Sequence, residues 1–203
     1  GGRLVFTKTT LLTSVLIVGC ALLPKNINAA TPVMNEPWDG LSGWSTSGNA
    51  FANAGELSLA AASSHSSVSR TDIDVPPTYK LTIRAQVTDY GAPRPGTYLL
   101  NASFAIRVID GKSMLMLKRE ADGIYCITAD SAMAWKKVVS DTASTAWTEY
   151  RIDVSEGEAS FQYKPDGGDW SDWHAFSLVP LGENKGEDMF ELWTNTDSSA
   201  VNV

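Results

Sequence analysis

Cysteine and histidine are scarce in this sequence, which has two residues of each type among 203. Zinc and related transition-metal sites need clustered His or Cys ligands, so these few residues do not supply one. The cysteines are Cys20 and Cys126. Cys20 lies in an N-terminal segment that we expect to be removed or lipidated, which leaves Cys126 without a disulfide partner. In the stretch IYCIT we expect Cys126 to be a buried, inert thiol.

Long apolar runs are also absent, and the most apolar stretch covers only residues 11 to 23, before Pro24. This run is shorter than the roughly 20 residues that a membrane-spanning helix needs. Arg3 and Lys8 precede it, and small residues follow it just before Thr31. This layout predicts a secretory signal peptide over residues 1–30.

A second interpretation of the same segment stays open. Ile17-Val18-Gly19-Cys20 resembles a bacterial lipobox, in which Cys20 would be lipidated and would become the new N-terminus. Either interpretation predicts an exported protein, extracellular or in the periplasm or cell envelope, whose contact with a membrane is at most a lipid anchor.

Basic residues are outnumbered by acidic ones, and the formal net charge is −7. The predicted signal peptide holds three basic residues and no acid, so its loss would bring the net charge to −10. An acidic surface repels phosphate backbones, so nucleic acid is not expected as a partner.

Helical periodicity is missing from every window of ten residues, whereas apolar and polar residues alternate in many short segments. Period two with one apolar face is typical of half-buried strands. The predicted strands cover residues 55–61, 67–75, 79–87, 103–110, 113–119, 124–128, 149–154, 159–164, 189–195 and 200–203. Short strands with regular turn signals predict an all-β, two-sheet antiparallel β-sandwich over residues 31–203, as a single domain. Because the last segment ends within a strand pattern, we expect the domain to be truncated at its C-terminus.

The segment YKPDGGDWSDWHAF, residues 163 to 176, places aromatic residues after a Gly-Gly. Asp166-Gly167-Gly168 predicts a hairpin turn, because glycine adopts the positive φ that tight turns need. On a strand, Trp170 and His174 would share one face and Trp173 the other. One of the two tryptophans is therefore expected to pack inward, and the other to offer its ring to a ligand.

Several segments together resemble the concanavalin A-like lectin and glucanase jelly roll, of the laminin-G-like bacterial secreted type. They are WDGLSGW before GELSLAA, the pair YKLTIRAQV and FAIRVIDGKSMLMLKR, the hairpin WTEYRIDVSEGEASFQYKPDGGDW, and the closing FELWTNTDSSAVNV. Relatives usually continue the closing strand into an Asp-Tyr pair, which is absent here. The resemblance implies a concave and a convex sheet, with ligands lying across the concave one.

The resemblance also implies a poly- or oligosaccharide as the partner of a monomeric, lectin-like domain. Outward residues of the middle strands and the aromatic residues would bind it. These candidates are Arg84, Gln86, Arg107, Lys118, Tyr125, Trp135, Trp170, Trp173, His174 and Trp193. Seven tryptophans in 203 residues favour a ligand-facing role for some of them. Solubilising strand residues and core aromatics are the alternative interpretation, which would make the domain structural or adhesive.

A divergent glycoside hydrolase or polysaccharide lyase is the enzymatic alternative. Glucanases of this fold use a Glu-x-Asp-x-(x)-Glu run, which is missing, and the nearest match is Glu187, Asp188 and Glu191. A lyase would need a base, for which His174 is the candidate, while His65 lies in a serine-rich loop. We therefore name no catalytic residue and lean towards binding without cleavage.

Calcium is the one metal that the resemblance leaves open, as a structural ion held by loop carboxylates and carbonyls. Asp39, Glu56 and the loop 166–169 are the candidate ligands. No EF-hand spacing supports them.

Overall fold

The computed structural model describes residues 4–8, 32–61, 65–93, 102–128, 134–155, 157–182, 187–197 and 199–203. In these residues it contains strands and no helix, and so no helix that could span a membrane. Most of the predicted signal peptide, including Cys20, lies outside the described residues.

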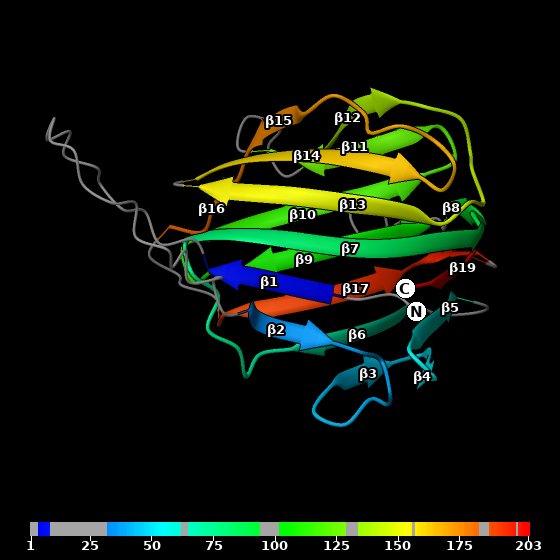
Figure 1. Ribbon diagram of the computed structural model, residues 1–203, viewed down its shortest axis with the longest axis horizontal. Helices are drawn as coiled ribbons and strands as arrows, with labels where there is room; N and C mark the ends of the chain where they lie inside the picture. The colour runs from blue at the N-terminus through cyan, green and yellow to red at the C-terminus, as the bar shows by residue number, and fades with distance from the viewer. Residues whose placement is uncertain are drawn as a thin grey trace, which may run out of the picture.

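Two antiparallel sheets form the structure, and Figure 1 looks onto the one called sheet A, with the other behind it. In spatial order, sheet A consists of β15 (His174–Ser177), β14 (Glu158–Pro165), β13 (Thr148–Ser155), β7 (Thr78–Asp89), β19 (Ser199–Asn202), β5 (Glu56–Ala61) and β4 (Asn49–Asn53). Two further strands extend it, β1 (Leu4–Lys8) beside β7 and β2 (Pro32–Glu36) beside β1.

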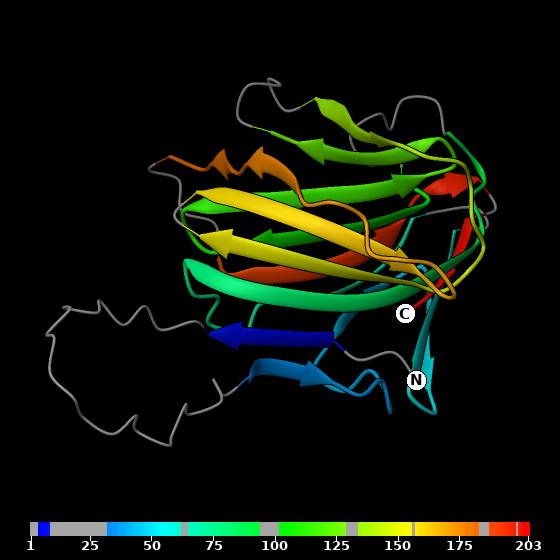
Figure 2. The ribbon, with the colours of Figure 1, turned by 45° about the horizontal axis from the view of Figure 1, so that its top comes forward.

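The second layer, sheet B, brings together segments that are distant in the chain. Its spatial order is β12 (Trp135–Ser140), β11 (Gly123–Ile127), β10 (Ser113–Glu120), β9 (Phe104–Ile109), β17 (Met189–Thr194), β6 (Ser66–Arg70) and β3 (Ser45–Ser47). The short β16 (Val179–Pro180) pairs with β10, and β8 (Ala92–Pro93) pairs with β18 (Thr196–Asp197). Figure 2 separates the yellow β13 and β14 of sheet A from the green β10 and β11 of sheet B.

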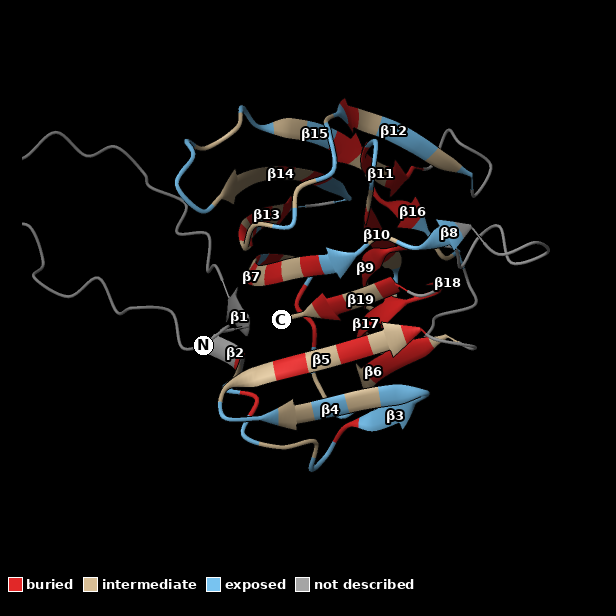
Figure 3. Cartoon of the chain, turned by 90° about the vertical axis from the view of Figure 1, so that its right-hand side faces the viewer, coloured by how far each residue is buried: buried red, intermediate tan, exposed pale blue. Residues whose placement is uncertain are grey.

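Alternation of side chains creates the core between the sheets. On β7, Tyr79, Leu81 and Ile83 are buried, while the residues between them point outward. The same alternation is visible along β5, where buried and intermediate residues follow one another in Figure 3. Full burial of such side chains stabilises the fold by roughly 1.5–3 kcal/mol each. The predicted all-β sandwich is therefore confirmed.

Several local predictions differ from the structure. The segment predicted as a strand over residues 67–75 ends at Arg70, where Arg70 binds Asp72 and the chain turns. Strand β12 was not predicted, because WKKVVS carries two lysines and lacks clear alternation. Strand β1 lies within the predicted signal peptide and pairs with Tyr79–Thr82 of β7.

Candidate functional site

The outer face of sheet B gathers five of the predicted ligand residues in two neighbouring rows across the strands. In one row, Lys137 pairs with Tyr125, Tyr125 with Lys118, Lys118 with Ala105, and Ala105 with Trp193. Because these residues are cross-strand partners, their side chains project from the same face.

The second row lies one step along the strands. Trp135 pairs with Ile127 at one side of the sheet, and Met116 pairs with Arg107, which pairs with Glu191. Arg107 and Lys118 therefore lie close together on one face, as the hairpin pattern predicted. We call the residues Arg107, Lys118, Tyr125, Trp135, Lys137, Glu191 and Trp193 the sheet B stripe.

Cations lie over aromatic rings throughout this stripe. The Lys118 ammonium is 5.2 Å from the ring centre of Tyr125 and 4.9 Å from that of Trp135. The Lys137 ammonium is 5.2 Å from the Tyr125 ring, and the Arg107 guanidinium is 5.8 Å from the Trp193 ring. Such contacts hold ring and cation in a fixed relative orientation.

Each of these cations also has a carboxylate partner. Arg107 Nη2 lies 2.5 Å from Glu191 Oε2, and Lys118 Nζ lies 3.0 Å from Glu120 Oε1. Glu120 in addition accepts a hydrogen bond of 2.7 Å from the Ser103 hydroxyl. The stripe therefore presents donors and acceptors side by side, with its charges largely compensated.

The third pair forms a small network at the edge of the sheet. Lys137 Nζ donates to Asp122 Oδ2 at 2.5 Å, and the Tyr125 hydroxyl donates to the same carboxylate at 2.8 Å. The hydrogen bond from Lys137, followed by that from Tyr125, lowers the pKa of Asp122. The Asp122 partner in turn raises the pKa of Lys137, and desolvation raises that of Tyr125. The network fixes the Tyr125 ring.

The aromatic residues of the stripe differ in how far they are buried. Trp193 is 1% exposed and packs with Ala105 and Met116 in an apolar cluster on this outer face. The Trp193 ring therefore lies beneath Arg107 and is not accessible to solvent. Tyr125 and Trp135 are partly exposed, so their rings are the accessible ones.

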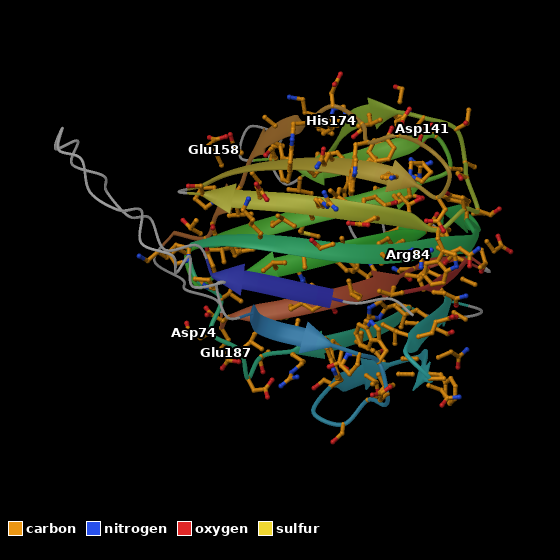
Figure 4. All side chains as sticks on the ribbon, in the orientation of Figure 1. Asp74, Arg84, Asp141, Glu158, His174 and Glu187 are labelled. Carbon is orange, nitrogen blue, oxygen red and sulfur yellow. The ribbon has the colours of Figure 1, made fainter. Side chains whose placement is uncertain are left out.

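Three of the remaining predicted residues, Arg84, Gln86 and His174, lie on strands of sheet A. Arg84 forms an ion pair with Asp166 at 2.5 Å and lies 4.9 Å from the Trp147 ring, while Gln86 donates to the Thr145 carbonyl. The structure thus separates Arg84 and Gln86 from Arg107 and Lys118 by the thickness of the sandwich. Figure 4 shows Arg84 towards one end of β7 and His174 at the edge formed by β15.

The alternation predicted for residues 170 to 176 is wrong in its first half. Strand β15 begins only at His174, because the Ser171 hydroxyl accepts the Tyr163 backbone N–H. Consequently neither tryptophan packs inward: Trp170 lies under the Arg151 guanidinium at 4.0 Å, and Trp173 is 48% exposed.

His174 and the predicted acidic cluster do not form a joint site. His174 stacks on Tyr163 and lies beside Phe161, both on sheet A. Glu191 pairs with Arg107 on sheet B, and Asp188 accepts the Val75 backbone N–H.

Metal ligands and the thiol can be placed as well. Among the described residues no group of three or more His, Cys, Asp or Glu side chains converges, and the calcium candidates Asp39, Glu56 and Asp166 form no such group. Cys126 is fully buried, which confirms the predicted burial, and desolvation raises the pKa of its thiol strongly.

Sequence reasoning missed Asp122, Glu120 and Lys137, which orient the predicted aromatic residues. Lys137 lies two residues after Trp135, so a strand through residues 135–140 would have placed both on one face.

Comparison with known proteins identifies the fold. No family model matches the chain, and no curated protein matches it in sequence. Among solved structures, the VIP36 exoplasmic/lumenal domain in its Ca²⁺/Man3GlcNAc-bound form has a TM-score of 0.54 at 11% identity, covering 81% of this chain and 85% of that one. Peanut lectin has a TM-score of 0.52 at 11% identity, covering 79% and 91%. Lectin I-B4 from Griffonia simplicifolia has 0.51 at 10%, covering 80% and 93%. The chain has the concanavalin A-like jelly-roll fold of these lectins.

Proposed function

We propose that this protein is an exported carbohydrate-binding domain, which holds a glycan against the sheet B stripe without cleaving it. The observation that carries the proposal is that Lys137, Tyr125, Lys118 and Trp135 share one sheet face, with each cation held by a carboxylate. The likeness to VIP36 and to legume lectins supports it.

The chemistry of the stripe suits a sugar. Sugars present flat patches of C–H bonds, which the Tyr125 and Trp135 rings can cover. Their hydroxyl groups both donate and accept hydrogen bonds, and the Arg107–Glu191 and Lys118–Glu120 pairs offer both functions at fixed positions.

Calcium takes no part in this proposal. Ca²⁺ is named with the VIP36 structures, and among the described residues of this chain no group of three or more His, Cys, Asp or Glu side chains converges. The glycan contacts are therefore assigned to the side chains of the stripe alone.

The test is a glycan array followed by titration calorimetry on the folded protein. Trp135→Ala and Tyr125→Ala should each weaken binding at least fivefold, since truncating a ring that packs on a ligand costs about 1 kcal/mol or more. Phe51→Ala is the matched control, because Phe51 is 65% exposed on β4, away from the stripe. Equal affinities of the variants and the parent protein would overturn the proposed site.

Cleavage is scored in the same samples through new reducing ends and the absorbance of unsaturated uronides. We expect neither product with any glycan that binds. Product release would contradict the binding function and support the hydrolase or lyase alternative. Any role in a polysaccharide-degrading system would then be catalytic.

Export is the second part of the proposal. It is supported by the basic, apolar and small-residue pattern of residues 1–30. Mass spectrometry of the protein from a bacterial envelope should show an N-terminus near Thr31, or at a lipidated Cys20. Either form lacks β1, so Tyr79–Thr82 of β7 would lose this partner strand. Intact residues 1–30 in the exported protein would contradict both forms.

A further inference from the structure

The outer face of sheet A, on the opposite side of the sandwich, contains a cavity that the proposed function does not use. Its volume is about 440 Å³, within the range of about 300–1,000 Å³ that small-molecule sites occupy. Its outward-facing lining comes from neighbouring strands: Thr78, Lys80, Asp153, Ser155, Ser160 and Ala175.

A single cross-strand row forms the middle of this cavity. Lys80 pairs with Asp153, Asp153 with Ser160, and Ser160 with Ala175. Lys80 Nζ lies 3.0 Å from Asp153 Oδ2, so a cation, a carboxylate and a hydroxyl follow one another. Ala175 adds no bulk at the end of the row, which leaves room beside Ser160.

The Trp170 ring lies near the cavity on the same face. Arg151 lies two residues from Asp153 on β13 and covers Trp170 at 4.0 Å. A chain of sugars that places one residue in the cavity can therefore continue towards Trp170.

Charge restricts the class of ligand. Lys80 is compensated by Asp153, Arg151 binds Glu149 at 3.0 Å, and Glu158 adds a further carboxylate at the cavity. Figure 4 shows Glu158 at the end of the sheet opposite to Arg84. With no spare cation at the cavity among its described lining residues, an anionic ligand gains nothing there.

We infer that sheet A carries a second binding site, independent of the sheet B stripe, for a neutral, hydroxyl-rich carbohydrate with one sugar residue in the cavity. Serine hydroxyls, the Lys80 ammonium and the Asp153 carboxylate supply the donors and acceptors for its hydroxyl groups. Two sites on opposite faces would make one molecule bivalent and able to cross-link glycan chains.

The test uses the full chain and titration calorimetry with neutral hexasaccharides of mannose, β-glucose and xylose, beside an oligogalacturonate as the anionic probe. Ser160→Trp fills the cavity, and Thr88→Trp adds the same side chain to β7 outside it. Asp153→Asn removes the acceptor charge at nearly constant size. We expect Ser160→Trp to remove one class of binding sites and Asp153→Asn to weaken the affinity of that class at least fivefold. Thr88→Trp should change neither the number nor the affinity of the binding sites.

The outcomes separate the two proposals. Loss of one class in Ser160→Trp and of the other in Trp135→Ala supports both sites. Unchanged binding in a folded Ser160→Trp variant overturns the sheet A site and leaves the stripe standing. Loss in Ser160→Trp with unchanged binding in Trp135→Ala overturns the stripe instead. Tighter binding of oligogalacturonate than of every neutral probe at the cavity would overturn the assigned ligand class.

Discussion

Arg107 and Glu191 face each other directly across β9 and β17, with Nη2 and Oε2 2.5 Å apart. The Arg107 side chain is 28% exposed and that of Glu191 is 11% exposed, and the buried Arg107 Nε has no hydrogen-bond partner among the described residues. This pair ties the two central strands of sheet B together beneath the proposed glycan.

Removal of one charge from this pair should destabilise the protein. Breaking a buried ion pair costs about 3–5 kcal/mol, and partial exposure of Arg107 reduces the expected cost of Glu191→Gln to about 1–3 kcal/mol. Urea denaturation measures the free energy of unfolding. Glu149→Gln is the control, because its pair with Arg151 is exposed and should contribute less than about 1 kcal/mol. Similar losses in both variants would contradict the structural role of Glu191.

Two turn glycines should respond differently to alanine. Gly123 has φ +153°, and a Cβ there would lie 2.1 Å from the Val139 carbonyl oxygen. Gly157 has φ +87° with open space around the Cβ position. We expect Gly157→Ala to cost about 1 kcal/mol through backbone strain. Gly123→Ala should cost at least about 2–3 kcal/mol and should displace β12, with Trp135 and Lys137. Equal losses of stability in the two variants, measured by thermal unfolding, would show that β12 can move away from residue 123 without a loss of stability.

The Asp122 network predicts how the site depends on pH. The pKa of Asp122 is lowered by the hydrogen bonds from Lys137 and Tyr125. The contribution of ionised Asp122 to folding stability is therefore fully present above the ordinary Asp pKa of about 3.9. It is lost as pH falls through the lowered pKa of Asp122 in the folded protein. NMR titration of the Asp122 carboxyl carbon and the Tyr125 ring should show both changing together below about pH 4. Asp122→Asn should abolish that transition at Tyr125. A midpoint above the ordinary value would contradict the network.

Burial of Cys126 predicts a thiol that reacts only on unfolding. Desolvation raises its pKa strongly, so the reactive thiolate is suppressed in the folded protein. In a Cys20→Ser protein, a maleimide reagent at pH 7 should label Cys126 in denaturant and leave it unlabelled for hours in buffer. Rapid labelling without denaturant would show that β11 opens locally.

Local sequence determined the strands and which of their side chains point away from the core. On β7 and β9, alternation alone placed Arg84 and Arg107 outward, because side chains on a strand point to opposite faces in turn. The glycine turns were predictable for the same local reason. Alternation failed at Trp170 and Trp173, where the Tyr163 backbone N–H donates to the Ser171 hydroxyl instead of to a backbone carbonyl.

Only the tertiary structure decided which outward residues from distant segments meet. Alternation distinguishes core-facing from outward-facing side chains, but a two-sheet sandwich has two outer faces. Pairing between distant segments assigns each strand to one of these faces. Thus β17 inserts between β9 and β6, bringing Glu191 and Trp193 to Arg107, whereas Arg84 joins Trp147 on the other side. The division of the candidate residues into two faces follows from strand order, which no local pattern contains.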